Sequence, residues 1–218
     1  ASILANLVDN NPNCFIFGYE KDRRTFVGAS PEILVRHRGS EILSYALAGT
    51  APKDGPNAWT KEQLLSDKKN LFEHNIVRDR IVNTMKQITP DVTVEETDIM
   101  ELAHLYHLRT IITAKDSTKS LVEWAKLLHP TPALGGEPRD KAMALLETYE
   151  AHERGMYAAP FGFMKDMGDG IVVVAIRSAL IMDNILYAYA GCGVVADSDA
   201  DEEYIETNNK MRTILDAL

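Results

Sequence analysis

Long apolar runs, closely spaced cysteines and an excess of basic residues are all missing from this sequence of 218 residues. No stretch approaches the roughly 20 apolar residues that a membrane-spanning helix needs. The net charge is -9, from 32 acidic and 23 basic residues. Because an acidic surface repels nucleic-acid backbones and anionic lipids, we expect neither a nucleic acid nor a membrane as a partner.

The two cysteines, Cys14 and Cys192, lie far apart in apolar surroundings. Such residues are typical of reduced, buried thiols, so we expect a cytoplasmic protein, with a disulfide between them as the alternative. The first ten residues, ASILANLVDN, show no secretory pattern and are typical of a helix entered partway. We therefore expect the chain to be a piece of a longer protein.

Strand-like and helix-like segments alternate in blocks, which favours an α+β fold. Hydrophobic residues make up 45% of the chain, enough for the core of one domain. We expect the strands to be antiparallel, with the first two joined by the turn at 21–24. The pattern predicts helices at 1–10, 66–88, 120–129 and 199–218, and one more helix with Pro138 in its first turn. It predicts strands at 14–20, 25–37, 41–49, 92–102, 104–114, 169–181 and 184–195.

Glu73 is the first carboxylate in an unusual place. Ile76 and Val77 follow it at i+3 and i+4, so its side chain shares a face with the apolar stripe of the predicted helix. A carboxylate there must be paired, hydrogen-bonded or bound to a metal ion, because burying it alone is costly. The alternative is a glutamate at the boundary of the core that is paired with Arg80.

The C-terminal helix places Glu203, Glu206 and Lys210 on one face. Glutamates without histidine or thiolate partners suit a hard cation such as Mg²⁺. The alternative is an exposed helix with an ordinary Glu–Lys pair.

Arg177 ends the apolar run IVVVAI, where a guanidinium needs an anionic partner unless it sits at an exposed strand end. Gly191 and Gly193 follow another predicted strand and allow close approach to the backbone. The sequence therefore indicates that Arg177 binds an anion, and that another group can approach the backbone at Gly191 and Gly193.

Eight motifs, in order, resemble those of the chorismate-binding enzymes, which comprise isochorismate, salicylate, anthranilate and aminodeoxychorismate synthases. The resemblance covers nearly the whole chain. It implies antiparallel sheets packed face to face with helices on the outside, of which residues 1–218 form a C-terminal part of one catalytic domain. The motifs are GASPEIL (28–34), LAGT (47–50), EH (73–74), HPTPALGG (129–136), ERGMYAAPFG (153–162), AIRSA (175–179), GCGVVADSD (191–199) and EEYIETNNK (202–210).

The resemblance implies roles for individual residues. Glu32 matches the general acid that protonates the departing C4 hydroxyl of chorismate, so burial and neighbouring carboxylates should raise its pKa. His107 matches a histidine near that hydroxyl, with a hydrogen-bonded strand histidine as the alternative. Glu73 and Glu206 match ligands of Mg²⁺, and Glu203 a nearby carboxylate that binds it directly or through water. Contacts with the substrate are implied for Gly49, Thr50, Ala133, Tyr157, Arg177, Gly191 and Lys210.

HPTPALGG most resembles the isochorismate synthases, because the ammonia-using enzymes more often have a threonine in place of Ala133. The resemblance implies Mg²⁺-dependent conversion of chorismate to isochorismate, in the menaquinone rather than the siderophore branch. The alternatives are an anthranilate or aminodeoxychorismate synthase component, a salicylate synthase, a non-catalytic dicarboxylate-binding module and a fragment that only folds.

One residue of the family pattern is missing. The lysine that activates water would lie upstream of the GASPE motif, and Lys21 is too near that motif to match it. We expect this piece alone to be inactive and to self-associate through exposed apolar surface.

Overall fold

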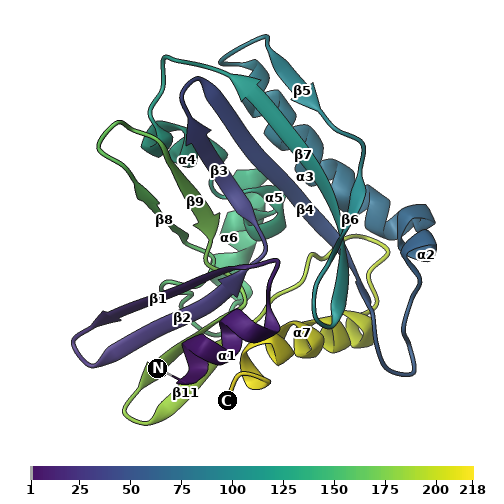
Figure 1. Ribbon diagram of the computed structural model, residues 1–218. Helices are drawn as coiled ribbons and strands as arrows, with labels where there is room; N and C mark the ends of the chain where they lie inside the picture. Colours follow the sequence, from purple (N-terminus) through teal and green to yellow (C-terminus); the bar gives the residue numbers. More distant parts are fainter. Residues whose placement is uncertain (1) are drawn as a thin grey trace.

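In the computed structural model, which describes residues 2–218, two antiparallel sheets carry helices packed against them, which confirms the α+β class (Figure 1). The helices are α1 (Ser2–Asn10), α2 (Lys61–Ser66), α3 (Lys68–Lys86), α4 (Leu121–Leu128), α5 (Pro132–Gly135), α6 (Arg139–Tyr149) and α7 (Ala200–Leu215). The strands are β1 (Phe15–Lys21), β2 (Arg24–Ser30), β3 (Ile33–Arg38), β4 (Glu41–Pro52), β5 (Val92–Val94), β6 (Asp98–Glu101), β7 (Leu105–Lys115), β8 (Pro160–Met164), β9 (Gly170–Val174), β10 (Ser178–Met182) and β11 (Ile185–Tyr189).

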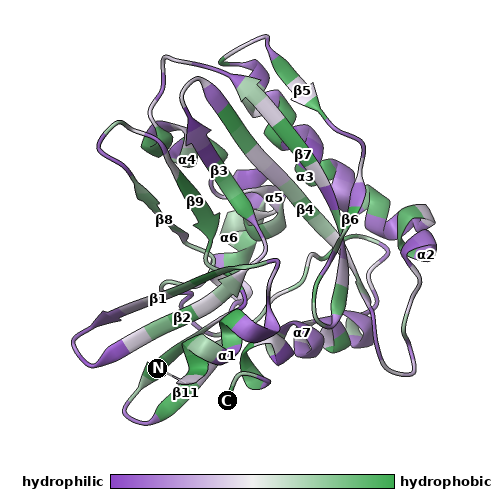
Figure 2. Cartoon of the chain, in the orientation of Figure 1, coloured by the Kyte–Doolittle hydropathy of each residue, from purple (hydrophilic) through white to green (hydrophobic). Residues whose placement is uncertain are grey.

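Each sheet has its own hydrophobic core against helices. The smaller sheet has the order β1-β2-β10-β11 and packs on α1 and α7 through residues such as Leu7 and Ile214. The larger sheet has the order β5-β7-β4-β3-β9-β8, with β6 beside β7, and packs on α3 and α4 through Ile81 and Trp124. Figure 2 shows the hydrophobic residues concentrated along the strands of this sheet. No helix within residues 2–218 is long and apolar enough to cross a membrane.

Three of the predicted strands are each divided into two in the structure. The segment 92–102 forms β5 and β6, which both pair with β7, and the other two segments divide between the sheets. The segment 25–37 forms β2 in the smaller sheet and β3 in the larger one, and 169–181 forms β9 and β10 in the same way. These last two breaks lie side by side, because the Ala29 amide donates to the Arg177 carbonyl (3.0 Å) and the Val174 amide to the Glu32 carbonyl (3.1 Å). Pro31 has no N–H to offer a strand ladder, which favours a break there. Glu32 and Arg177 therefore both lie where the two sheets meet.

Capping side chains set where the main helices begin. The Asp67 side chain accepts a hydrogen bond from the Asn70 amide, so α3 starts two residues later than predicted and the short α2 precedes it. In α4, Ser120 and Glu123 form a reciprocal capping box. Pro138 occupies the N-cap position of α6 without a side-chain hydrogen bond, one residue before the first turn in which it was predicted, and the short α5 forms within a segment predicted to be a loop.

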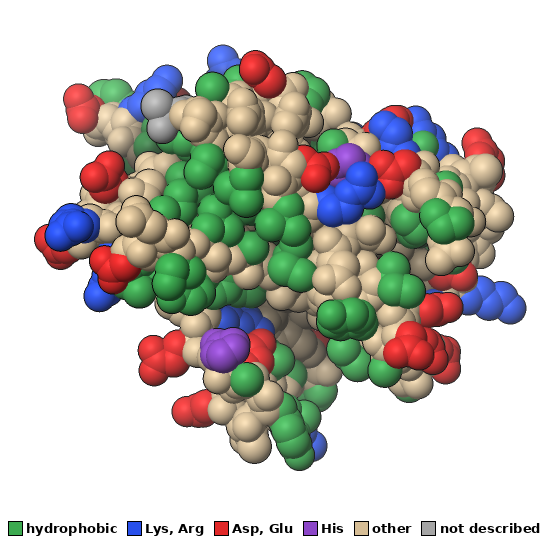
Figure 3. Space-filling view, turned by 90° about the horizontal axis from the view of Figure 1, so that it is seen from below, with side chains coloured by type: hydrophobic (Ala, Val, Ile, Leu, Met, Phe, Trp, Pro, Cys, Tyr) green, Lys and Arg blue, Asp and Glu red, His purple; other side chains and the backbone are tan. Residues whose placement is uncertain are grey.

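The smaller sheet leaves one face uncovered by helices. Val27 and Ala179 point toward α1 and α7, so the alternating residues of each strand point away from those helices. Hydrophobic side chains form a broad patch on the face of the molecule seen from below (Figure 3). Self-association through apolar surface stays a prediction. The apolar side chains on the uncovered face that remain exposed are Phe15, Tyr19, Ile185 and Tyr187.

Both cysteines are free, as expected of reduced thiols, but they are half-buried rather than buried. Burial raises the pKa of each thiol to about 11, so both are neutral near pH 7.

Candidate active site

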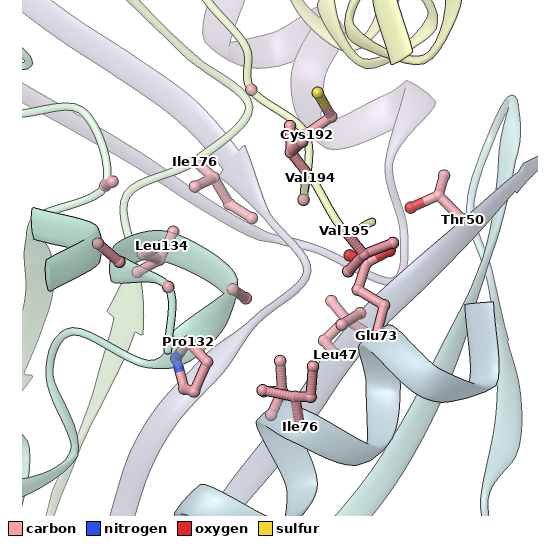
Figure 4. A pocket seen from close by; sticks show the side chains of 18 of the residues that line it. Leu47, Thr50, Glu73, Ile76, Pro132, Leu134, Ile176, Cys192, Val194 and Val195 are labelled. Carbon is pink, nitrogen blue, oxygen red and sulfur yellow. The ribbon is translucent and has the colours of Figure 1, made fainter. Parts of the chain in front are cut away.

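A cavity of about 660 Å³ lies between α3, α5, the junction of the two sheets and the loop after β11. Figure 4 shows Glu73 pointing from α3 toward the segment that carries Val194 and Val195, with Ile176 and Leu134 across the cavity. Gly49, Glu203 and Glu206 are not among its lining residues. The predicted site residues that do line it are Glu32, Thr50, Glu73, His107, Ala133, Tyr157, Arg177, Gly191 and Lys210.

Glu32 is an uncharged carboxyl group in the cavity wall. Its side chain belongs to the segment between β2 and β3 and is only 2% exposed. Burial raises its pKa to about 8, although Arg177, Lys210 and Thr131 act in the opposite direction. One carboxyl oxygen, Oε1, has no hydrogen-bond partner among residues 2–218. At pH 7 this group is mostly protonated and can donate a proton to a ligand.

Arg177 is buried beside it without a carboxylate partner. The residue is 5% exposed, which excludes the exposed strand end that the sequence left open. Its backbone has φ of 51°, in the left-handed region that residues with a Cβ rarely adopt. Within residues 2–218 its guanidinium forms no ion pair, and its Nη2 atom lies 2.8 Å from Nε2 of His107. A buried guanidinium without an ion-pair partner can bind an anionic ligand.

Thr50 and His107 face each other on paired strands. The register of β4 and β7 pairs the two residues, after an irregularity between Leu47 and Thr50. Gly49 occupies this irregularity with φ of 78°. Thr50 Oγ1 lies 3.0 Å from Nδ1 of His107, so both ring nitrogens of His107 have partners. The alternative of a hydrogen-bonded strand histidine agrees with this geometry.

Lysines neutralise two of the three predicted metal ligands. Lys69 binds Glu203 at 2.5 Å, and Lys210 binds Glu206 at 2.5 Å. Lys210 also donates to the Gly191 carbonyl at 3.0 Å. The predicted Glu–Lys pair of the C-terminal helix therefore exists, but both of its side chains are largely buried rather than exposed.

Of the three predicted metal ligands, Glu73 is the one that has no lysine or arginine partner in the described part of the chain. Arg80 pairs with Glu137 instead, at 3.3 Å. Burial raises the pKa of Glu73 to about 7, and Glu206 and Glu203 add to this rise. Carboxylate oxygens are the ligands that a hard divalent cation prefers, and such a cation would relieve the repulsion between these carboxylates. Glu73, Glu203 and Glu206 therefore fit Mg²⁺ in their chemistry. Within residues 2–218, no three acidic, His or Cys side chains are gathered closely enough to hold a metal ion as they stand, and the magnesium site stays a prediction.

Glycines let side chains come close to the loop after β11. A Cβ on Gly193 would lie 2.3 Å from Oε1 of Glu73, and one on Gly191 would lie 2.9 Å from the Tyr157 hydroxyl. The Tyr157 ring stacks on that of Tyr189, with centroids 5.5 Å apart. The close approach predicted at these glycines is thus made by the protein's own site residues.

Two polar residues at this site, Lys69 and Thr131, were not predicted from the sequence. Lys69 lies one helical turn before Glu73, a spacing that suggests a pair within α3, yet it binds Glu203 from a segment 134 positions away. Thr131 is 1% exposed, its hydroxyl has no hydrogen-bond partner in residues 2–218, and it lies near enough to Glu32 to offset part of the rise in that pKa. Its place in HPTPALGG was the only available signal.

We expect Gly49→Ala to destabilise the fold around this site. The new Cβ would lie 2.9 Å from the Asn70 carbonyl oxygen and 3.0 Å from a Leu108 methyl group, at a φ that disfavours alanine. The expected loss is about 2–4 kcal/mol in the free energy of unfolding. Gly39→Ala is the matched control, because φ there is 60° and no atom lies within 4 Å. It should cost only about 1 kcal/mol. Urea denaturation of both variants measures the difference, and equal losses would contradict the close approach.

Comparison with known proteins connects this arrangement to one group of enzymes. A sequence model described as chorismate binding enzyme matches residues 1–218. The chain is 37% identical to isochorismate synthase MenF of Bacillus subtilis over 99% of this chain and 47% of that protein. It is 36% identical to the salicylate biosynthesis isochorismate synthase of Pseudomonas aeruginosa over 93% of this chain and 44% of that protein.

Solved structures agree. One assigned as the 2,3-dihydroxybenzoate-specific isochorismate synthase DhbC of Bacillus anthracis has a TM-score of 0.94 and 32% identity, covering 99% of this chain and 61% of that one. The menaquinone-specific isochorismate synthase MenF of Escherichia coli has a TM-score of 0.87 and 31% identity, covering 98% and 51%. The chain spans about half the length of the relatives it matches.

Proposed function

The chain belongs to the chorismate-binding enzymes, and from that membership we propose that it is part of an isochorismate synthase. The reaction is the conversion of chorismate to isochorismate, in which water adds at C2 and the C4 hydroxyl leaves. Relatives named as isochorismate synthases support this choice. The observation that carries it is the pairing, in one cavity, of the protonated Glu32 with the unpaired guanidinium of Arg177.

The two groups supply different parts of the reaction. Glu32 gives its proton to the departing C4 hydroxyl, and the apolar surroundings that keep it protonated also exclude competing water. Arg177 binds the enolpyruvyl carboxylate, and Tyr157 closes that side of the cavity. Thr50, Lys210 and the backbone at Gly49 and Gly191 contact the rest of the substrate.

Magnesium completes the proposal for the ring carboxylate. Glu73 and Glu206 would hold the ion, with Glu203 binding directly or through water. When bound, the ion neutralises an acidic wall that otherwise repels a dianion. For these residues to bind it, Lys69 and Lys210 must leave the carboxylates that they now occupy.

Water is the proposed nucleophile because Ala133 lines the cavity where ammonia-using relatives more often have threonine. The second candidate is an ammonia-using anthranilate synthase component, since such a protein of Thermococcus kodakarensis is 32% identical over 99% of this chain. Product analysis with chorismate and ammonia separates the two. Identity to the MenF protein of Bacillus subtilis supports the menaquinone branch, whereas the higher TM-score belongs to the dihydroxybenzoate-specific enzyme, so the proposal is for the reaction and not the pathway.

We expect the 218-residue chain alone to form no isochorismate from chorismate and Mg²⁺. No lysine of the chain matches the one that activates water in the family pattern, because Lys21 lies too near the GASPE motif. A coupled assay for isochorismate should show product only when a longer polypeptide supplies a further lysine. Formation of isochorismate by this chain at the rate of the longer polypeptide would contradict the proposal of a missing base.

A further inference from the structure

We propose that His107 is a positioning residue: a neutral imidazole, protonated on Nδ1, that holds the guanidinium of Arg177 and turns the Thr50 hydroxyl into the cavity. This deepens the proposed function and rests on it only for the identity of the ligand. It replaces the role near the departing hydroxyl that the family resemblance implied for His107.

Nε2 of His107 accepts a hydrogen bond from Arg177. It lies 2.8 Å from Nη2 of Arg177. A guanidinium has five N–H donors and no acceptor, so at this distance the ring nitrogen must be the acceptor. The lone pair of Nε2 therefore points at Arg177, and the ring proton must lie on Nδ1 if the ring is neutral.

The other ring nitrogen of His107 faces Thr50. Nδ1 of His107 lies 3.0 Å from Thr50 Oγ1, and with the proton on Nδ1 the hydroxyl oxygen is the acceptor. The hydroxyl proton of Thr50 is then free to point elsewhere. Thr50 lines the cavity, and its amide is held by Asn70 Oδ1 at 2.8 Å. The imidazole N–H donates to the Thr50 hydroxyl, and that hydroxyl in turn donates to the ligand. Thr50 is therefore a hydrogen-bond donor to the substrate.

His107 and Arg177 differ in how firmly the backbone holds them. His107 is 3% exposed on β7, a strand paired with β4, β5 and β6, so its ring is rigidly placed. Arg177 leaves a backbone break between two sheets at a positive φ. The histidine thus fixes a long side chain whose own backbone lies outside any strand.

The neutral state has independent support. Burial, and then the nearby Arg177 and Lys210, lower the pKa of His107 well below its usual value. With Nε2 accepting from Arg177 and the Nδ1 proton directed at Thr50, no proton of His107 is available to a departing hydroxyl. The geometry supports positioning rather than acid catalysis.

The direct test is the tautomer of His107, measured by ¹⁵N NMR of the imidazole nitrogens in the 218-residue chain near pH 7. We expect a proton on Nδ1 and none on Nε2, the less common tautomer of histidine in water. His107→Gln assigns the signals, and Arg177→Met should release Nε2 to take up a proton. A proton on Nε2 in the wild-type chain, or a ring that titrates near neutral pH, would overturn the proposal. Because no ligand is added, this result does not depend on the proposed function.

Calorimetric titration with chorismate in the presence of Mg²⁺ supplies the second readout. Glutamine can place an amide oxygen near the position of Nε2, so His107→Gln should bind chorismate within about threefold of wild type. His107→Leu removes the acceptor and should weaken binding about tenfold or more. Equal losses in both variants would contradict a positioning role. If the wild-type chain binds no chorismate while the Nδ1 tautomer is present, the proposed function fails and the positioning of Arg177 stands.

Discussion

Glu32→Gln is expected to stabilise the chain in alkaline buffer while removing its proton donor. The folded-state pKa of Glu32 is raised from 4.5 to about 8, mainly by burial. Between these two values the folded chain binds more protons than the unfolded chain, so the free energy of unfolding falls as pH rises through this window. Above pH 8 the buried charge costs on the order of a few kcal/mol, which glutamine avoids.

Urea denaturation at pH 5 and pH 9 measures this effect. The stability of Glu32→Gln relative to wild type should increase between the two pH values. Glu147→Gln is the control, because Glu147 is exposed on α6 and its replacement removes one negative charge without changing a buried group. A difference between Glu32→Gln and wild type that does not grow with pH would show that Glu32 is already ionised in the folded state.

The same substitution separates an enzyme from a binding module. In a longer polypeptide that turns over chorismate, loss of a general acid should lower the rate by about 10²–10⁴-fold. The wild-type rate should fall as pH rises through about 8, where Glu32 loses its proton. A non-catalytic dicarboxylate-binding module would bind chorismate alike with glutamate or glutamine at this position.

Arg177→Met is expected to weaken chorismate binding by about a hundredfold, because two charge-assisted hydrogen bonds contribute about 3 kcal/mol. The guanidinium is buried in the cavity wall without a carboxylate partner in residues 2–218, so its charge is available to an anionic ligand. Methionine keeps much of the side chain's length but removes the charge and the donors. Calorimetric titration with chorismate measures the loss, and binding equal to wild type would show that the carboxylate lies elsewhere.

Two further variants at this position separate charge, shape and backbone strain. Arg177→Lys keeps a positive charge without the planar fork, so it should bind more tightly than Arg177→Met but less tightly than wild type. Arg177→Gly also removes the guanidinium, but glycine adopts a φ of 51° without strain. The free energy of unfolding of Arg177→Gly should therefore exceed that of Arg177→Met by about 1 kcal/mol, which urea denaturation measures.

The sequence predicted the class of fold and most of the residues that share the cavity. Glu32, Glu73 and Arg177 could be found because each places a charge in an apolar run or in an ordered motif. The same apolar runs predicted the helices well, since Leu121, Trp124 and Leu128 do line the buried side of α4.

What the sequence could not predict depends on contacts between distant segments. Strand periodicity continues through 25–37 and 169–181, and only pairing with neighbouring strands decides that each segment divides between two sheets. The partner of Lys69 could not be predicted either, since spacing within α3 favours Glu73 while the folded chain brings Glu203 within reach. Similarly, the family resemblance implied that His107 lies near the substrate, but its contact with Arg177 depends on the three-dimensional arrangement.

The side-by-side breaks in the strands also constrain how this molecule can move. The two backbone hydrogen bonds described above, Ala29 to Arg177 and Val174 to Glu32, join the chain segment of Glu32 to the chain segment of Arg177 at the seam between the sheets. A rocking motion of one sheet about this seam would carry the acid and the guanidinium as a unit. Glu73, which projects from α3 on the larger sheet's helical layer, would change its distance to them. Opening and closing of such a cleft would therefore adjust the acidic wall while the geometry of proton donor and anion binder stays constant.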